Sequence, residues 1–239
     1  MPLWGLYAYL YGLSLKNLFP YRQLLQDLKN ALDIKGQESI LDAGCGPGLL
    51  LERIIQDHQG TGTTVTGVDL SRVMLQHARR RCKRFCNVRL VAADLNNKLD
   101  FPDGSFDKVI CCHTLYALQS PPRTITEFYR LLKPGGILII ANPRPGAGQR
   151  ELIREHVATL RKLTPMRKRA YHVLLFVALI PVNLIVVAIN RLIIDRARRK
   201  QYHFLNEEDL KSALLQAGFK TVHISSCYAG QDCLVRAEK

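Results

Sequence analysis

The sequence predicts an α/β fold in which a parallel sheet carries helices on both faces. Short apolar runs alternate with helical patterns over residues 39–140, and alternation of this kind produces parallel sheets. A glycine-rich turn follows the first apolar run, and an aspartate follows each of the next two runs closely. The length of 239 residues fits one large domain, or one domain with an elaboration.

The apolar runs and helical patterns define the elements in order along the chain. The first five predicted strands are Ser39–Leu41, Thr64–Val68, Val88–Ala92, Lys108–Cys112 and Ile137–Ala141. The predicted helices among them are Leu49–Gln56, Ser71–Arg84 and Pro122–Leu132. Ser71 is expected to cap its helix, and the stop signal Lys133-Pro134-Gly135-Gly136 to end the third one. A helix at Glu207–Ala217, stopped by Gly218, precedes two last strands at Lys220–Ser225 and Cys233–Arg236.

Composition restricts the classes of function. A hydrophobic fraction of 47% with 23% charged residues excludes a disordered or fibrous chain. The net charge of +14 indicates an anionic partner, which could be nucleic acid, a membrane surface or an acidic substrate. The odd number of seven cysteines argues against a secreted disulfide framework. Since no cysteine or histidine pairs show zinc spacing and no signal peptide is evident, we expect reduced thiols, no metal site and a cytoplasmic setting.

The turn after the first strand carries the strongest functional signal. Gly44, Gly46 and Gly48 lie between a strand and a helix, where glycines permit a tight turn and close approach of a ligand to the backbone. Asp69 ends the next strand, where a carboxylate can accept both hydroxyls of a ribose. Asp94 follows the third strand and could accept an adenine amino hydrogen. Three glycines alone would also fit an ordinary strand–helix turn.

Five segments, in this order, resemble the successive motifs of class I S-adenosylmethionine-dependent methyltransferases. They are LDAGCGPG, VTGVDLS, AADL, FDKVICCHTLYAL and RLLKPGG. The similarity covers residues 34–142 and resumes in FLNEEDLKSALLQAGFK near the C-terminus. A dinucleotide-binding dehydrogenase is the competing family, but its fingerprint does not predict RLLKPGG. The resemblance implies a Rossmann-like seven-stranded sheet, S-adenosyl-L-methionine as cofactor, and a lipid- or quinone-directed member of the family.

The resemblance also implies roles for individual residues. Gly44 and Gly46 would let the backbone approach the methionine part of the cofactor, and Asp42 would support that loop through water. Asp69 would hold the ribose. The remaining implied contacts are Leu70 and Met74 along the adenine, Asp94 and Leu95 at its edge, and the backbone around Cys112 facing the sulfonium. For Leu70 and Met74, plain core packing is an equal alternative.

Methyl transfer requires an acceptor held in line with the sulfonium, and some acceptors also need a base. His113 and Tyr116, just after the fourth strand, are the candidates for that base, although a lone histidine at a strand end is more often structural. The fourth strand ends in CCHTL. It lacks the Asn/Asp-Pro-Pro-aromatic element of enzymes in this family that methylate amino groups of nucleic acids. This absence counts against a nucleic-acid base as the acceptor.

An uncharged run of 21 residues, Ala170–Asn190, interrupts the α/β rhythm. It is long enough to span a bilayer, but one crossing would separate the last strands from the sheet that they complete. Twelve basic and three acidic residues lie between Arg150 and Lys200, on both sides of the run. Pro181 should bend any helix there. We expect a bent helix or shallow hairpin in one leaflet of an anionic membrane; the alternatives are a dimer contact, a cap over a soluble substrate and a true span.

These patterns divide the chain into four segments. They are an aromatic N-terminal helical segment (1–30), a cofactor-binding core (31–141), a basic and apolar membrane-docking insertion (142–204) and the last helix and strands of the core (205–239). The N-terminal segment, with aromatic residues from Trp4 to Tyr21, is expected to anchor at a membrane interface, to close the cofactor site, or both. Tyr11 is expected near the methionine end of the cofactor.

The sequence therefore predicts a methyltransferase that is peripheral or monotopic on the cytoplasmic membrane face and acts on a membrane-resident lipid. The acceptor would be a phospholipid headgroup amine, a quinone or another polyprenyl lipid, with the amine slightly favoured by the resemblance. An RNA methyltransferase is the second hypothesis, although the basic residues lack the interleaved aromatics of stacking sites. A soluble small-molecule methyltransferase with an apolar cap and a cofactor-binding scaffold without turnover are further alternatives. A homodimer through the insertion is also open.

Overall fold

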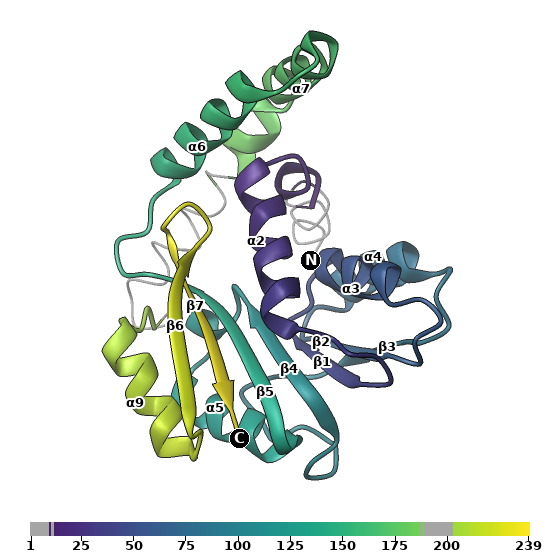
Figure 1. The fold of residues 1–239 in the computed structure, drawn as a ribbon, viewed down its shortest axis with the longest axis vertical. Helices are drawn as coiled ribbons and strands as arrows, with labels where there is room; N and C mark the ends of the chain where they lie inside the picture. Colours follow the sequence, from purple (N-terminus) through teal and green to yellow (C-terminus); the bar gives the residue numbers. More distant parts are fainter. Residues whose placement is uncertain (1–9, 11, 187, 189–202) are drawn as a thin grey trace.

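One seven-stranded sheet forms the centre of the computed structural model, which describes residues 10, 12–186, 188 and 203–239. Its strands are β1 (Ser39–Ala43), β2 (Thr64–Asp69), β3 (Val88–Ala92), β4 (Phe106–Cys112), β5 (Leu132–Pro143), β6 (Thr221–Cys227) and β7 (Asp232–Glu238). They lie in the order β3-β2-β1-β4-β5-β7-β6 (Figure 1). Strands β1 to β5 are parallel, and β7 is antiparallel to both neighbours. The predicted α/β class and the seven-stranded sheet are confirmed.

Helices cover both faces of this sheet. They include α2 (Phe19–Leu32), α3 (Leu49–Asp57), α4 (Arg72–Cys82), α5 (Pro121–Leu131) and α9 (Glu207–Ala217). Because side chains of a strand alternate between faces, β5 contributes to two cores. Leu138 and Ile140 belong to the cluster with residues of α5 and α9. Ile139 and Ala141 belong to the cluster with residues of α2, α3 and α4.

Strand β5 begins five residues earlier than the sequence predicts, at Leu132 instead of Ile137. The preceding helix ends at Leu131, as the stop signal predicts, but the stop signal itself then runs on as strand. The pairing of β5 with β4 shifts register between Phe106 and Lys108, and Gly135 in this bulge has φ of +73°. A bulge of this kind depends on pairing with another strand, so local propensity does not reveal it.

The helix caps follow the sequence closely. The hydroxyl of Ser71 accepts a hydrogen bond from the backbone N–H of Met74 at 3.3 Å, which confirms Ser71 as the N-cap of α4. Helix α9 ends at Gly218, whose φ is +106°, as the glycine stop predicts.

The chain between β5 and α9 forms α6 (Gln149–Lys162), α7 (Met166–Ala178) and a short helical segment, Ile180–Val186. Figure 1 shows α6 and α7 projecting beyond the end of the sheet at which β5 ends. Within the described residues, no individual helix combines the length and apolar composition of a membrane span. Helix α7 and Ile180–Val186 meet those criteria only as a pair, bent by 48°.

Pro181 explains the bend between α7 and the segment after it. It has no N–H to donate to the preceding turn, so the helix is interrupted at Leu179. Helical hydrogen bonding resumes where Asn183 N–H donates to the carbonyl of Leu179 at 2.8 Å. The bend was expected from this proline.

A histidine of the insertion fastens it to α2. The backbone N–H of Phe19 donates to Nδ1 of His156 at 3.1 Å, which supplies an acceptor that the N-cap residue Leu18 does not. The two rings stack with centroids 5.1 Å apart. Burial lowers the pKa of His156 to about 4, so the ring is neutral near pH 7 and Nδ1 can accept this bond. Helix α6 therefore helps to set the position of α2.

Some of the sequence predictions concern residues outside the described part of the chain. They are Trp4, Tyr7, Tyr9 and Tyr11 of the N-terminal segment, and the second basic flank from Arg191 to Lys200. Phe19 and Tyr21 belong to the first turn of α2, which continues to Leu32 and so passes the segment boundary expected at residue 30. The expected position of Tyr11 beside the cofactor stays a prediction.

Acidification should weaken the junction between α6 and α2. Because the pKa of His156 falls from 6.5 to about 4 on folding, its contribution to stability is present above about pH 6.5 and is lost as the pH falls towards about 4. A His156→Phe variant keeps the stacked ring but removes the acceptor. We expect it to lose about 1 kcal/mol at pH 7 and to show a smaller loss of stability on acidification. Urea unfolding of the wild type and the variant at pH 7 and pH 5 measures the free energy of unfolding. If acidification lowered it equally in the two proteins, the prediction would be wrong.

Candidate active site

The glycine loop and Asp69 form one hydrogen-bonded unit at the carboxyl ends of β1 and β2. The N–H groups of Gly44 and Cys45 both donate to the carbonyl of Val68, at 2.8 and 3.0 Å. The N–H of Gly46 donates to Oδ2 of Asp69 at 2.9 Å. The sequence predicts a common site for these residues, and the structure brings them together.

Gly44 and Gly46 need to be glycine for different reasons. Both have a positive φ, +85° at Gly44 and +52° at Gly46, which other residues adopt at a cost. A Cβ on Gly44 would lie 2.1 Å from Oγ1 of Thr114, so protein atoms close this position. Among the described residues, a Cβ on Gly46 would meet no atom within 4 Å. The open space beside Gly46 is therefore where a ligand can approach the backbone.

Asp69 is held in place by two backbone donors. Its Oδ1 accepts from the N–H of Ser71 at 2.8 Å, and its Oδ2 accepts from Gly46 at 2.9 Å. Burial raises the pKa of Asp69, and these two hydrogen bonds partly offset the increase. A carboxylate offers about four acceptor positions, so capacity remains for the two hydroxyls of a ribose.

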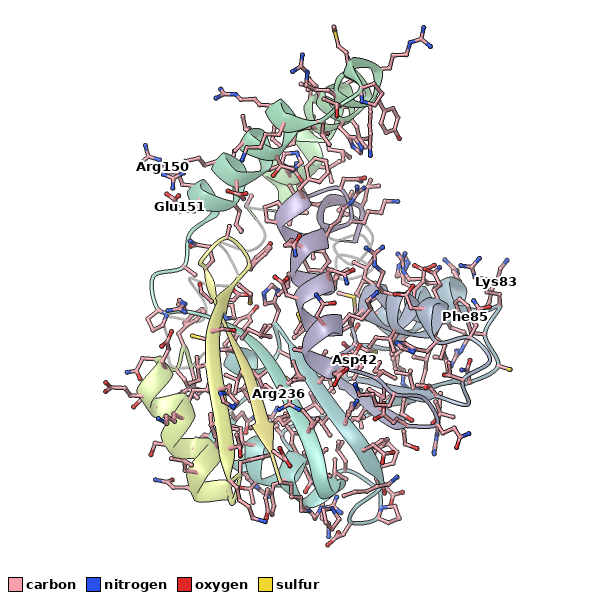
Figure 2. The ribbon with its side chains drawn as sticks, in the orientation of Figure 1. Asp42, Lys83, Phe85, Arg150, Glu151 and Arg236 are labelled. Carbon is pink, nitrogen blue, oxygen red and sulfur yellow. The ribbon has the colours of Figure 1, made fainter. Side chains whose placement is uncertain are left out.

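Asp42 is a buried carboxyl group that lacks a full set of partners. It is 2% exposed, and its Oδ2 has no hydrogen-bond partner among the described residues. Burial and the nearby Asp69 raise its pKa to about 7. Figure 2 shows Asp42 at the sheet beside α2. A buried acceptor without a partner is costly, and a positively charged ligand would satisfy it. This chemistry fits a cofactor that carries an ammonium and a sulfonium group.

The residues expected around the adenine divide into exposed and buried ones. Leu70 is 69% exposed, which excludes core packing for it, and Met74 is partly buried in the first turn of α4. Oδ1 of Asp94 accepts from both the backbone and the side-chain amide of Asn96, at 2.9 and 2.8 Å, and so organises the loop after β3. The Leu95 side chain is instead 6% exposed within the core. Only its backbone is available for a contact at the adenine edge.

His113 is paired with a buried carboxylate. This residue directly follows β4, and its backbone is in the left-handed region, with φ of +52°. Its backbone N–H donates to the carbonyl of Ala141 at 2.9 Å. Its Nε2 lies 2.5 Å from Oδ2 of Asp232, which is 1% exposed. When Nε2 donates its hydrogen to Asp232, Nδ1 is the ring nitrogen left to accept a proton. This arrangement fixes the orientation of His113 and suits a base.

Aromatic side chains enclose this pair. The Tyr228 ring centroid lies 5.2 Å from that of His113, and the Tyr21 ring lies 6.3 Å from that of Tyr228. Burial raises the pKa of both tyrosines, and Cys112 and Asp42 raise that of Tyr21 further. Burial likewise raises the pKa of the Cys112 thiol. The phenols and the thiol therefore stay protonated near neutral pH.

Sequence reasoning missed Asp232, Tyr228 and the place of Tyr21 in this site. Asp232 is 119 positions from His113 along the chain, so no local spacing signals their contact. Tyr116 lies on a 3-10 turn, Leu115–Ala117, where its ring stacks on Phe204 with centroids 5.2 Å apart. The buried carboxylate partner favours His113 over Tyr116 as the base.

Comparison with known proteins identifies relatives of the cofactor-binding region. Residues 40–136 match a family model described as a methyltransferase domain. A demethylmenaquinone methyltransferase of Tropheryma whipplei is 39% identical over 111 residues, which cover 46% of this chain and 43% of that protein. The chain thus spans less than half of that relative's length. A Staphylococcus saprophyticus protein of the same name is 28% identical over 83% of this chain and 77% of its own length.

Solved structures show the same fold over most of the chain. One is an S-adenosylmethionine-dependent methyltransferase from Mesorhizobium loti. It has a TM-score of 0.62 at 19% identity, and the match covers 90% of this chain and 96% of that one. One from Aquifex aeolicus has a TM-score of 0.58 at 18% identity, covering 93% and 90%. These likenesses show the fold, and the match to a methyltransferase domain supports S-adenosylmethionine as the cofactor of the site.

An alanine at Gly46 should block the cofactor without disturbing the fold. Its Cβ meets no protein atom within 4 Å, so Gly46→Ala should cost only the strain of a positive φ, about 1–2 kcal/mol. We expect cofactor affinity to fall at least about tenfold, because the Cβ occupies the space that the ligand needs. Calorimetric titration and thermal unfolding measure the two effects.

Two further glycines provide controls for this prediction. Gly60→Ala carries the same kind of strain, with φ of +77° and open space around it, and should leave cofactor affinity unchanged. Gly44→Ala should instead destabilise the protein strongly, because of the clash with Thr114. If Gly46→Ala bound the cofactor as tightly as Gly60→Ala, the cofactor would have to lie elsewhere.

Cofactor binding should be coupled to ionisation of Asp42. Its pKa of about 7 without ligand should fall when a cation binds beside it, so binding releases a proton below pH 7. We expect affinity to rise at least about tenfold from pH 5 to pH 8 and this dependence to disappear in Asp42→Asn. Calorimetry in buffers of different ionisation enthalpy counts the proton. The same proton release in both proteins would exclude Asp42 as its source.

Proposed function

We propose that this chain, a member of the class I S-adenosylmethionine-dependent methyltransferases, methylates the hydroxyl-bearing ring of a membrane lipid, such as a quinol. The observation that carries the proposal is the His113–Asp232 pair, with Nε2 and Oδ2 2.5 Å apart. His113 directly follows β4. Strand β4 neighbours β1, which ends at the glycine loop. Open α/β sheets bind their ligands at this edge, which supports His113 as the base.

The residues of the chain would prepare the acceptor. The cofactor, when bound, supplies a methyl group that its sulfonium makes electrophilic. Nδ1 of His113 would accept the proton of the acceptor hydroxyl. The resulting imidazolium would be stabilised by Asp232, which is buried and already oriented toward Nε2. Once a ring carbon has taken the methyl group, the proton that this carbon loses would restore the hydroxyl. Tyr21 and Tyr228, as buried phenols, would exclude water from the reacting groups.

An aromatic acceptor is favoured by two features. The rings of Tyr21, Tyr228 and His113 form one cluster, and clusters of aromatic rings favour packing with a flat head group. The proteins named demethylmenaquinone methyltransferase support an acceptor of the quinol type. A headgroup amine, slightly favoured on sequence alone, is the second candidate, supported by an Arabidopsis thaliana relative named phosphoethanolamine N-methyltransferase 3, 31% identical over 49% of this chain.

Cofactor labelled on its methyl group tests this proposal directly. The protein would be incubated with total membrane lipids and, separately, with total RNA, and each mixture divided into organic and aqueous phases. We expect label in the organic phase, on a species that absorbs as a quinol. Label on a phospholipid would select the amine, and label confined to the aqueous RNA sample would overturn the proposal.

Variants of His113 and Asp232 should separate the methyl transfer step from cofactor binding. His113→Asn and Asp232→Asn should lower kcat by about 100-fold or more while cofactor affinity changes little, since neither residue belongs to the glycine loop. The exposed histidine of β6 offers a control: His223→Asn should retain full activity. If His113→Asn turned over at the wild-type rate and with the same pH profile, the assignment of the base would be wrong.

A further inference from the structure

Large apolar side chains are unusually exposed on the insertion. Nine of the twelve exposed large hydrophobic residues of the described structure lie between Ile153 and Ile185. Tyr171, Leu174 and Val177 are 63%, 70% and 55% exposed, and their spacing of three places them along one side of α7. Leu184 and Ile185, 63% and 46% exposed, extend the apolar surface past the bend. Apolar surface of this extent marks an interaction site.

Basic residues border this apolar surface. The last turn of α6 and the first turn of α7 carry five exposed cations, which are Arg161, Lys162, Arg167, Lys168 and Arg169. No aspartate or glutamate occurs from His156 to Ile194. Figure 2 shows nitrogen-tipped side chains radiating from α6 and α7 at the end of the molecule away from the sheet. We call the apolar residues Tyr171, Leu174, Val177, Leu184 and Ile185, together with these five cations, the docking face.

The charge of the docking face selects its partner. In a twofold dimer the same patch would meet itself, and five cations would approach five cations without a carboxylate between them. A cap over a soluble substrate would turn its apolar side chains toward that substrate, whereas the apolar side chains of this face are 46–70% exposed. An anionic bilayer satisfies both parts of the face, because its headgroups attract the cations and its acyl region accepts the apolar side chains.

The docking face is also connected to the site. Ser14 Oγ donates to Oδ1 of Asn183 at 2.5 Å, so the segment after the bend is joined to the chain just before α2. His156 of α6 accepts from Phe19 at the start of α2. Helix α2 carries Tyr21, whose ring contacts Tyr228 beside His113. These contacts join the docking face to the surroundings of His113 through α2.

We infer that the docking face binds the surface of a bilayer containing anionic phospholipids and so holds the active site where a lipid acceptor is available. The inference deepens the proposed function, because it says where the acceptor is met, but binding itself requires no turnover. Its test can therefore fail or succeed independently of the methyl transfer reaction.

Flotation of the full chain with vesicles tests the inference. Vesicles of phosphatidylcholine alone are compared with vesicles that contain phosphatidylglycerol in addition. We expect at least about tenfold stronger binding to the anionic vesicles. Leu174→Asp combined with Leu184→Asp, and separately a triple variant Arg167→Glu, Lys168→Glu, Arg169→Glu, should each reduce that binding by about tenfold or more.

Matched substitutions elsewhere on the surface serve as controls. Leu215 on α9 is also exposed, at 50%, so Leu215→Asp introduces the same change away from the docking face. The triple variant Arg79→Glu, Arg80→Glu, Lys83→Glu alters the net charge equally from the region of α4, and Figure 2 shows Lys83 far from Arg150 of α6. Both controls should bind anionic vesicles as the wild type does.

The inference would be overturned by equal binding to both kinds of vesicle, or by docking-face variants that bind like their controls. A wild-type dimer that Leu174→Asp converts to a monomer, with no vesicle binding by either form, would assign the face to a second copy. Methyl transfer to an acceptor dispersed in detergent separates the two proposals. Variants that lose vesicle binding should keep that activity, whereas vesicle binding without any acceptor methylation would leave docking intact and reject the proposed function.

Discussion

The antiparallel pairing of β7 with β5 is the interaction on which the rest of the structure depends. Its register sets Asp232 opposite Pro143, at the carboxyl end of β5, and His113 is tied to the same strand through Ala141. The pairing thus delivers a buried carboxylate to a histidine far away in the sequence. It also requires the chain that leaves β5 to return to the same sheet. The insertion between β5 and α9 must therefore begin and end on the same side of any membrane.

The site gains its chemistry from groups that reduce stability. Asp42 is buried beside Asp69 without a full set of partners, and His113 adopts a left-handed backbone conformation that costs free energy in a residue other than glycine. Such costs persist only where the surrounding structure enforces them. Here the sheet register and the glycine loop do so. A cationic cofactor would relieve the cost at Asp42, so the folded chain is prepared for a ligand of that charge.

The insertion and the catalytic core meet at α2. Its first N–H is capped by His156 from α6, and its Tyr21 packs against Tyr228 near His113. The first contact is partly buried and the second is buried, so α2 contacts both regions. A surface event on α6 or α7 has a direct packing route to the site, through a stacked ring and a hydrogen bond.

Much of the fold could be predicted from the sequence, because the patterns that indicate it involve residues close together along the chain. The Ser71 cap, the glycine turn at Gly44 and Gly46, and the alternation of apolar runs each depend on residues a few positions apart, and the structure confirms them. The extended start of β5, the burial of the Leu95 side chain and the Asp232 partner of His113 were decided by contacts between distant segments. A sequence pattern specifies which face a side chain occupies within its own element. Which other element covers that face depends on how the whole sheet closes, and only the tertiary structure determines that.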